Sequence, residues 1–288
     1  MAAIARLAPA KVNLFLHVGP LEADGYHPLA SLVVFADIGD RLTVEPAERL
    51  SLTVTGAFAD VLEGEGDNLV LRAVRALGAA AGIGEPGLHI TLDKQLPVAA
   101  GLGGGSSDAG AALKLARDAL GLPFEDAALA EIAAHLGADG PMCLHASAAW
   151  AEVRGDVLTF ETGLPPLPAL LVNPGVPSST GAVYRAFDDG APGAADRPVP
   201  PSAWDPASVL DWLAAQRNDL QVPAVSLAPA IGEALAATAD LPGTRLTRMS
   251  GSGATVFALF DTAAAAEAAE AALSARHPDW WVRPTTLR

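Results

Sequence analysis

The stretch LPVAAGLGGGSSDAGAALKLARDALG, residues 96–121, contains five glycines between Gly101 and Gly110, with two serines and an aspartate among them. A loop so rich in glycine loses much conformational entropy on folding, so a bound group that needs bare backbone would explain its composition. A chain of phosphate groups is the first candidate, because backbone N–H groups without side chains can closely approach phosphate oxygens.

The residues that follow the glycines predict a helix over 107–120. Ser106 or Ser107 is a suitable N-cap, and Gly121 is a typical helix stop. The N-terminus of such a helix would add its partial positive charge to the loop. The stretch therefore predicts a phosphate-binding loop that opens a helix.

Two common phosphate loops fit this stretch less well. A Walker-type loop needs a lysine directly after its glycines, and the next lysine here is Lys114. A dinucleotide fingerprint needs a third glycine where this chain has Ser106, and Pro97 separates the glycines from the preceding strand. A flexible loop with a serine cap remains an alternative at this point.

Composition narrows the class of protein. The chain has 288 residues, of which 51% are hydrophobic, so it can form one large domain or two ordinary ones and is not disordered. A net charge of −15 argues against a nucleic-acid-binding protein. The one cysteine, Cys143, excludes an internal disulfide framework. Because no long apolar run lacks charges or prolines, we expect no membrane span and a cytoplasmic protein.

The pattern along the chain predicts an α+β protein, because many strands precede the first helices. We expect a domain over 1–155 and a second, α/β-sandwich domain over 156–288, with a mobile surface loop at 186–205. Strands are predicted at 11–19, 31–39, 41–46, 49–56, 87–97, 168–175, 245–251, 254–260 and 280–284, with a hairpin at 148–161. Helices are predicted at 66–82 (capped by Asp67 or Asn68), 124–137, 207–215, 227–239 and 262–276.

Three further stretches carry polar residues at positions that suit a site. Lys11 and Asn13 lie two apart on a predicted strand, so both project from the same side. Asp139 lies in a turn after a helix, and residues 251–253 form a Gly-Ser-Gly turn between two strands. Each of these stretches alone is more often an ordinary structural feature.

Taken together, these stretches resemble one known family. PVAAGLGGGSSDA resembles the phosphate loop of the GHMP kinase superfamily, and SGSGATVF resembles its C-terminal motif. APAKVNLFLHV, DGYHPL and GADGP are similar to the members of that superfamily that act on a cytidine-diphosphate-linked methylerythritol. The resemblance implies two α+β domains with the active site in the interdomain cleft. It also implies ATP-dependent phosphorylation of the 2-hydroxyl of that substrate, a step of the non-mevalonate isoprenoid pathway.

The resemblance also implies residue roles. Lys11 and Asp139 would lie at the reacting centre, where Asp139 would accept or orient the hydroxyl proton and Lys11 would neutralise the transferring group. Tyr26 and Tyr184 would stack on the cytosine ring, and His27 would read its Watson–Crick edge. The implied substrate-binding residues are Asn13, Tyr26, His27, Thr180 and Tyr184.

The resemblance implies that ATP, together with Mg²⁺, is held by a larger set of residues. The implied nucleotide-binding residues are Asn68, Lys94, Pro97, Gly101, Gly103, Gly104, Gly105, Ser106, Ser107, Gly251, Ser252 and Gly253. The resemblance implies a small-molecule substrate and neither a nucleic-acid nor a membrane partner. One departure is Gly140, where the family pattern has a bulky aliphatic residue, so we expect a looser turn at Asp139.

Two alternative functions stay open on the sequence. One is a related kinase of the same superfamily with a mevalonate-like or homoserine-like acceptor, which would not need Tyr26, His27 and Tyr184 as a set. The other is a nucleotide-binding module without catalytic activity, which would be expected to lack Lys11 or Asp139.

Overall fold

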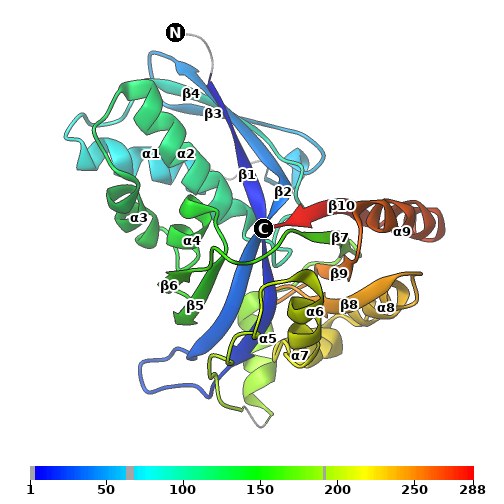
Figure 1. Ribbon diagram of the computed structural model, residues 1–288. Coiled ribbons are helices and arrows are strands. Elements are labelled where there is room, and N and C mark those ends of the chain that lie inside the picture. Colours follow the sequence, from blue (N-terminus) through cyan, green and yellow to red (C-terminus); the bar gives the residue numbers. More distant parts are fainter. Residues whose placement is uncertain (1–3, 63–67, 191–192) are drawn as a thin grey trace. The chain divides into compact units, whose positions relative to one another are not determined.

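The computed structural model describes residues 4–62, 68–190 and 193–288, which group into two compact units (Figure 1). The first unit draws on the segments up to Lys11, 38–98 and 103–146, and the second on 12–37, 99–102 and 147–288. The units thus divide the chain at several points, and the single boundary at residue 155 stays a prediction. The location of the active site relative to the two domains also stays a prediction.

The first unit combines a small mixed sheet with a group of helices. β4 pairs antiparallel with β2 and parallel with β3. Figure 1 shows α1 and α2 side by side, with α3 and α4 next to them. Buried side chains from the strands and from these helices form its core. Its elements are β1 (Ile4–Val18) and β2 (Leu29–Pro46), which also enter the second unit, β3 (Ser51–Thr55), η1 (Ala59–Leu62), α1 (Leu69–Ala80), β4 (Leu88–Asp93), α2 (Gly104–Leu120), α3 (Asp126–Ala134) and α4 (Gly140–His145).

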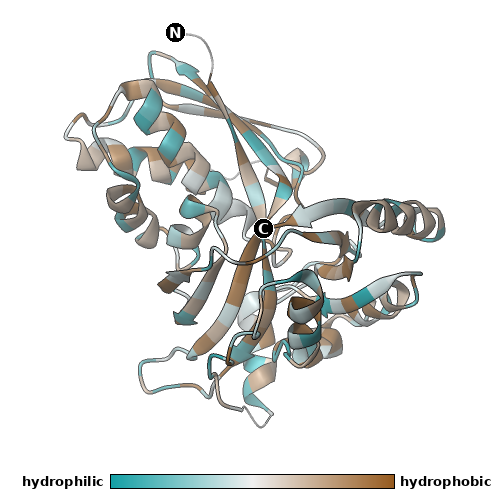
Figure 2. Cartoon of the chain, in the orientation of Figure 1, coloured by the Kyte–Doolittle hydropathy of each residue, from teal (hydrophilic) through white to brown (hydrophobic). Residues whose placement is uncertain are grey.

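The second unit is built on antiparallel strands. β10, β7, β9 and β8 are successive neighbours, and β5 pairs with both β2 and β6. Hydrophobic residues are concentrated on these strands (Figure 2), and every residue of β9 is buried. Its other elements are β5 (Ala149–Val153), β6 (Val157–Phe160), β7 (Leu167–Asn173), α5 (Thr180–Asp188), α6 (Pro206–Ala214), α7 (Gln221–Leu227), α8 (Pro229–Ala239), β8 (Thr244–Met249), β9 (Val256–Phe260), α9 (Ala263–Arg276) and β10 (Trp281–Leu287).

The prediction of two strands at 31–39 and 41–46 is wrong, because β2 is continuous from Leu29 to Pro46. The first of these predicted strands ends at Gly39, but in the structure this glycine marks a close approach of two backbones within a continuous strand. A Cβ at Gly39 would lie 2.1 Å from the carbonyl oxygen of Ala8. The glycine is therefore required by a neighbouring strand and not by a turn.

The prediction of a serine N-cap for the phosphate-loop helix is also wrong. α2 begins at Gly104, and its N-cap is Gly103, with a left-handed φ of 62°. Ser106 and Ser107 consequently lie inside the first turn of the helix. The predicted end at Gly121 is confirmed, since this residue has a φ of 61° and closes α2.

Several local assignments differ from the predicted ones. The helix expected at 227–239 is confirmed as α8, which begins at Pro229, whereas the short helix α7 before it was not predicted. Helices α4 and α5 were not predicted, and α5 takes up the first residues of the 186–205 loop. Two residues of that loop, 191 and 192, lie outside the described residues, as does the alternative cap Asp67. In the described parts of the chain, no helix is both long enough and apolar enough to cross a membrane.

Candidate active site

The structure brings Lys11 and Asp139 together in the first unit. Lys11 lies on β1 and Asp139 is the N-cap residue of α4, and the distance from Lys11 Nζ to Asp139 Oδ2 is 3.2 Å. The lysine side chain is 8% exposed and the aspartate side chain 39%. Because the Asp139 carboxylate makes no capping bond to its own helix, it is held by the lysine and remains open to a ligand.

The stem of Lys11 packs against the start of α2. A Cβ at Gly103 would lie 3.2 Å from Lys11 Cβ and 3.4 Å from Lys11 Cε. Gly103 also needs its positive φ, so a glycine is required here for two separate reasons. The packing sets the lysine beside the N-terminal end of the helix that follows the glycine loop.

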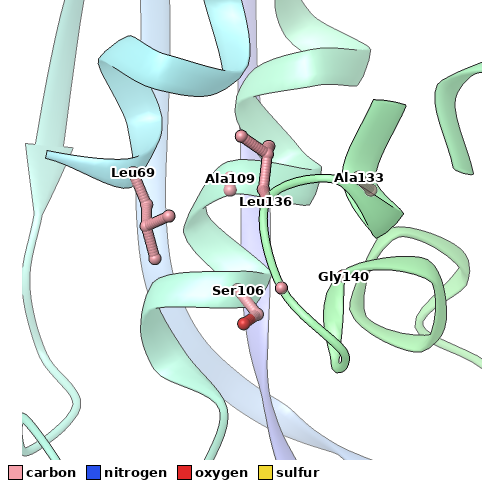
Figure 3. A pocket seen from close by; sticks show the side chains of 7 residues that line it. Leu69, Ser106, Ala109, Ala133, Leu136 and Gly140 are labelled. Carbon is pink, nitrogen blue, oxygen red and sulfur yellow. The ribbon is translucent and has the colours of Figure 1, made fainter. Parts of the chain in front are cut away.

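The turn that carries Asp139 packs tightly on α3. A Cβ at Gly140 would lie 2.1 Å from the carbonyl oxygen of Ala133, so no side chain fits at this position. Gly140 therefore permits a close contact, contrary to the looser turn that we expected. A small pocket beside it is bordered by Leu69 on α1 and Ser106 on α2 (Figure 3). The phosphate-loop helix and the Asp139 turn thus face the same pocket.

The first turn of α2 presents backbone donors. Among the described residues no side chain caps this helix, so the N–H groups of Gly104, Gly105 and Ser106 keep their capacity to bind an acceptor. Gly105 is exposed, whereas Ser107 is 1% exposed and donates its N–H to the carbonyl oxygen of Gly103. An anion at this turn would receive both the N–H donors and the positive end of the helix dipole.

Lys94 lies beneath this turn and is 3% exposed. Its Nζ is 2.5 Å from Asp40 Oδ2 and 2.8 Å from Asp108 Oδ2. Burial alone would lower the pKa of Lys94, but the two carboxylates outweigh it and the pKa is raised. Burial raises the pKa of Asp108 to about 7, although Lys94 opposes the change. Direct contact of Lys94 with a nucleotide stays a prediction.

Two other predicted nucleotide-binding residues have clear local roles. Asn68 caps α1, because its Oδ1 accepts a hydrogen bond of 2.9 Å from the N–H of Val70. Pro97 is buried in the segment that connects β4 to the glycine loop. Neither observation tests a contact with ATP.

In the second unit, Asn13 offers one free acceptor. Its Nδ2 donates to Ser31 Oγ at 2.8 Å, and the Ser31 hydroxyl donates its only hydrogen to the carbonyl oxygen of Phe15 at 2.6 Å. The serine can therefore only accept from Asn13, which fixes the orientation of the amide. Asn13 Oδ1 is buried and has no partner among the described residues.

The glycine turn of residues 251–253 packs on residues 99–102 within the second unit. Ser250 Oγ donates to the carbonyl oxygen of Gly101 at 2.9 Å. A Cβ at Gly101 would lie 2.4 Å from the carbonyl oxygen of Ser250, and Gly101 has a φ of 75°. Thr180 Oγ1 is 2.9 Å from Ser252 Oγ. Thr180, a predicted substrate-binding residue, thus contacts the glycine turn that is predicted to bind the nucleotide.

Tyr26, His27 and Tyr184 also belong to the second unit. The Arg154 guanidinium lies over the Tyr26 ring, 4.2 Å from its centroid, and Tyr26 is 56% exposed. The His27 ring centroid is 5.0 Å from that of Tyr184. His27 Nδ1 is 2.9 Å from the carbonyl oxygen of Gly19, and its Nε2 is 3.3 Å from Asp188 Oδ1. Both ring nitrogens therefore have protein partners.

A pocket in the second unit is bordered by Tyr26, His27, Glu152 and Arg154. Arg154 also forms an ion pair with Asp24. A ring, an imidazole and a guanidinium on one pocket can bind a planar base together with an anionic group.

Sequence reasoning missed four residues at these places: Asp40, Asp108, Arg154 and Asp188. The sequence carries no local signal for any of the four, because each has its ion-pair partner 14 or more residues away.

Comparison with known proteins agrees with the order of these motifs. A family described as "GHMP kinases N terminal domain" matches residues 68–147, and "GHMP kinases C terminal" matches residues 205–279. A protein of Caulobacter vibrioides (strain NA1000 / CB15N) named 4-diphosphocytidyl-2-C-methyl-D-erythritol kinase is 52% identical over 287 residues, which cover 99% of each chain.

Two further relatives cover practically the whole chain. A Methylobacterium radiotolerans protein of the same name is 50% identical and is matched over 100% of both chains. A crystal structure of a 4-(cytidine 5'-diphospho)-2C-methyl-D-erythritol kinase superposes with a TM-score of 0.80 at 35% identity, over 99% of each chain. The fold, two α+β GHMP kinase domains, is thereby confirmed. The chain belongs to the GHMP kinase family and, within it, to the 4-diphosphocytidyl-2-C-methyl-D-erythritol kinases.

Proposed function

We propose that this protein transfers the γ-phosphoryl group of ATP to the 2-hydroxyl of 4-diphosphocytidyl-2-C-methyl-D-erythritol. The observation that carries the proposal is the Lys11–Asp139 pair, 3.2 Å apart, with the lysine packed against the uncapped start of α2. A cation and a carboxylate beside free N–H donors suit phosphoryl transfer, in which positioning and charge neutralisation account for most of the catalysis.

In the proposed reaction, the 2-hydroxyl oxygen attacks the γ-phosphorus, and the bond from that phosphorus to the bridging oxygen of ADP breaks. The hydroxyl proton passes to Asp139, whose carboxylate is open to a ligand. Lys11 neutralises negative charge on the transferring group. The acceptor is a hindered tertiary alcohol, so alignment of the two reactants matters more than the strength of the base.

The N–H groups at the start of α2 would bind the ATP phosphates. Asn13 would hold a substrate hydroxyl through Oδ1, because that buried atom can only accept a hydrogen bond and lacks a partner among the described residues. Such a contact would steer the reacting hydroxyl toward the phosphate.

Recognition of the cytidine part would rest on aromatic side chains. Tyr26 and Tyr184 would stack on the base, which contributes about 0.5–1.5 kcal/mol beyond the buried area. His27 would read the Watson–Crick edge, which requires it to exchange one of its two protein partners for the base. We expect discrimination against uracil, which carries a donor at N3 where cytosine has an acceptor.

Mg²⁺ is proposed from the chemistry of ATP. Among the described residues no three His, Cys, Asp or Glu side chains gather as a metal site, so the ion would be bound chiefly by phosphate oxygens. When bound, it would neutralise charge on the β- and γ-phosphates. The substrates are small water-soluble metabolites, which favours a cytoplasmic location.

The test is identification of the product. Purified protein with MgATP is offered the cytidine-diphosphate substrate, its uridine analogue, mevalonate and homoserine, and products are read by phosphorus NMR and mass spectrometry. We expect phosphorylation of the cytidine compound only. Turnover of mevalonate or homoserine instead would refute the proposal, and equal turnover of the uridine analogue would refute the role of His27.

A further inference from the structure

Asp40, Lys94 and Asp108 form a charged cluster that is buried beneath the first turn of α2. Their exposed fractions are 0%, 3% and 3%. A Cβ at Gly104 would lie 3.1 Å from Lys94 Nζ and 3.6 Å from Asp40 Oδ2, so only the bare backbone of the helix separates the cluster from its N-terminal turn. The cluster therefore lies close to any anion that binds at this turn.

The two carboxylates of the cluster differ in their hydrogen bonds. Asp40 accepts from Lys94 through Oδ2, and from the N–H groups of Gln95 and Leu96 through Oδ1 at 2.6 and 2.8 Å. Asp108 accepts from Lys94 through Oδ2, but its buried Oδ1 has no partner among the described residues. An unpartnered oxygen in a buried carboxylate is a suitable place for a proton, because the charged form there lacks a compensating donor.

Charge counting points to the same residue. With all three groups ionised, the cluster carries one excess negative charge, which would repel phosphates at the turn above it. One proton on Asp108 leaves the Lys94–Asp40 ion pair and removes that excess. Burial, which raises the pKa of Asp108 to about 7, brings this titration to neutral pH.

The other titratable groups on the helices packed against α2 have partners or surroundings of their own. On α4, burial and the nearby Asp139 and Asp108 carboxylates raise the pKa of the Cys143 thiol to about 12. Burial lowers the pKa of His145, whose charged neighbours are Lys114 and Asp126. On α1 and α3, Arg75 pairs with Glu85, and Asp126 pairs with Lys114 and Arg117 of α2. The remaining charged residues on these two helices, Arg72 and Glu131, are exposed.

We propose that Asp108 is a proton-linked positioning residue, which takes up a proton from solvent when ATP phosphates bind at the first turn of α2. The inference rests on the ATP site of the proposed function and adds a residue that touches neither substrate. The carboxylate gains one proton, and no other bond changes. Lys94 and Asp40 then support the loop as a neutral pair.

The sign of the pH effect follows from this linkage. Below about pH 6, Asp108 is protonated in the free protein already, so ATP affinity is at its plateau. As the pH rises through neutrality, binding must include proton uptake and the affinity falls. Each unit by which ATP raises the pKa of Asp108 gives about a tenfold difference in Kd between the two plateaus.

The test is calorimetry of MgATP binding, without acceptor, in buffers of different ionisation enthalpy at pH 7. For the wild-type protein we expect uptake of about 0.3–0.5 proton per ATP, and less at pH 5.5 because Asp108 is then already protonated. Asp108→Asn should lose this uptake and keep the low-pH affinity at pH 8. Asp118→Asn removes a carboxylate from the exposed side of the same helix, and it should behave as wild type.

Titration of the nucleotide itself contributes equally in all three proteins, so the comparison isolates Asp108. Equal proton uptake by wild type and Asp108→Asn would overturn the inference, and so would wild-type uptake that is undiminished at pH 5.5. The second result needs no variant, so it holds even if Asp108→Asn folds poorly. Absence of ATP binding in wild type would overturn the proposed function as well, whereas ATP binding without uptake would overturn the inference alone.

Discussion

Substitution of Gly105 by alanine tests whether this glycine is required for folding or for binding of the ATP phosphates. Gly105 is the second residue of α2, is exposed and has no positive φ, and its added Cβ would meet only the end of the Leu69 side chain, at 3.3 Å. Alanine is favoured over glycine within a helix by about 1 kcal/mol. If the glycine served only the fold, Gly105→Ala would be neutral or would stabilise the protein.

We expect the opposite effect on ATP. The new methyl group would stand on the exposed side of the turn, where it would keep the phosphates from the N–H donors. A hydrogen bond to a charged group is worth about 1.5–3 kcal/mol, so loss of one weakens the binding of MgATP about 10- to 100-fold. Gly232→Ala in α8 is a matched control, since its Cβ would also meet only the end of a side chain, Val225 Cγ1 at 3.1 Å.

Thermal unfolding and calorimetric titration of both variants test this reasoning. The expected pattern is a Tm that is unchanged or raised by a few degrees in both, with loss of ATP affinity in Gly105→Ala only. A Gly105→Ala protein that binds MgATP as tightly as wild type would refute the assignment of this turn to the phosphates.

Three other predictions concern stability and specificity. Arg248 is 6% exposed and donates to the carbonyl oxygens of Leu14, Leu213 and Gln216, so we expect it to stabilise the second unit. Arg248→Met should lower the free energy of unfolding in urea by about 3 kcal/mol, and Arg248→Lys should restore only part of it. The pKa of Asp108 is raised to about 7 in the folded protein, so the folded protein keeps a proton that the unfolded chain releases near pH 4. The free energy of unfolding should therefore fall by up to about 4 kcal/mol as the pH rises from about 4 to 7. Asp108→Asn should make the free energy of unfolding less dependent on pH over this range. Tyr26→Ala should raise KM for the cytidine substrate about tenfold with little change in KM for ATP in steady-state kinetics, and equal changes in both constants would contradict the stacking role.

The elements that sequence alone predicted best are those fixed by local patterns. The course of α1 follows from its apolar spacing and the Asn68 cap, and the end of α2 follows from Gly121. Two glycines were misinterpreted, Gly39 from the local strand pattern and Gly140 from its departure from the family pattern, because each is required by a contact with another segment. Gly39 and Gly140 are required by the carbonyl oxygens of Ala8 and Ala133, which lie 31 and 7 residues before them.

The candidate site shows the same division. The motifs around Lys11 and Asp139 were visible in sequence, and the family resemblance joined them, although 128 residues separate the two. The buried cluster beneath α2 was not predicted, because the burial of Asp108 and its distance to Lys94 depend on how β2, β4 and α2 pack. Packing of distant elements, rather than local pattern, thus determines which charges meet.

The most direct test of the central claim is ADP release with MgATP and 4-diphosphocytidyl-2-C-methyl-D-erythritol, measured for wild type, Lys11→Met and Asp139→Asn. Both substitutions preserve side-chain size approximately, and retained binding of MgATP would show that each variant is folded. We predict robust turnover by wild type and a fall in kcat of about 100-fold or more in each variant. Turnover near the wild-type rate in both variants would contradict the placement of phosphoryl transfer at the Lys11–Asp139 pair.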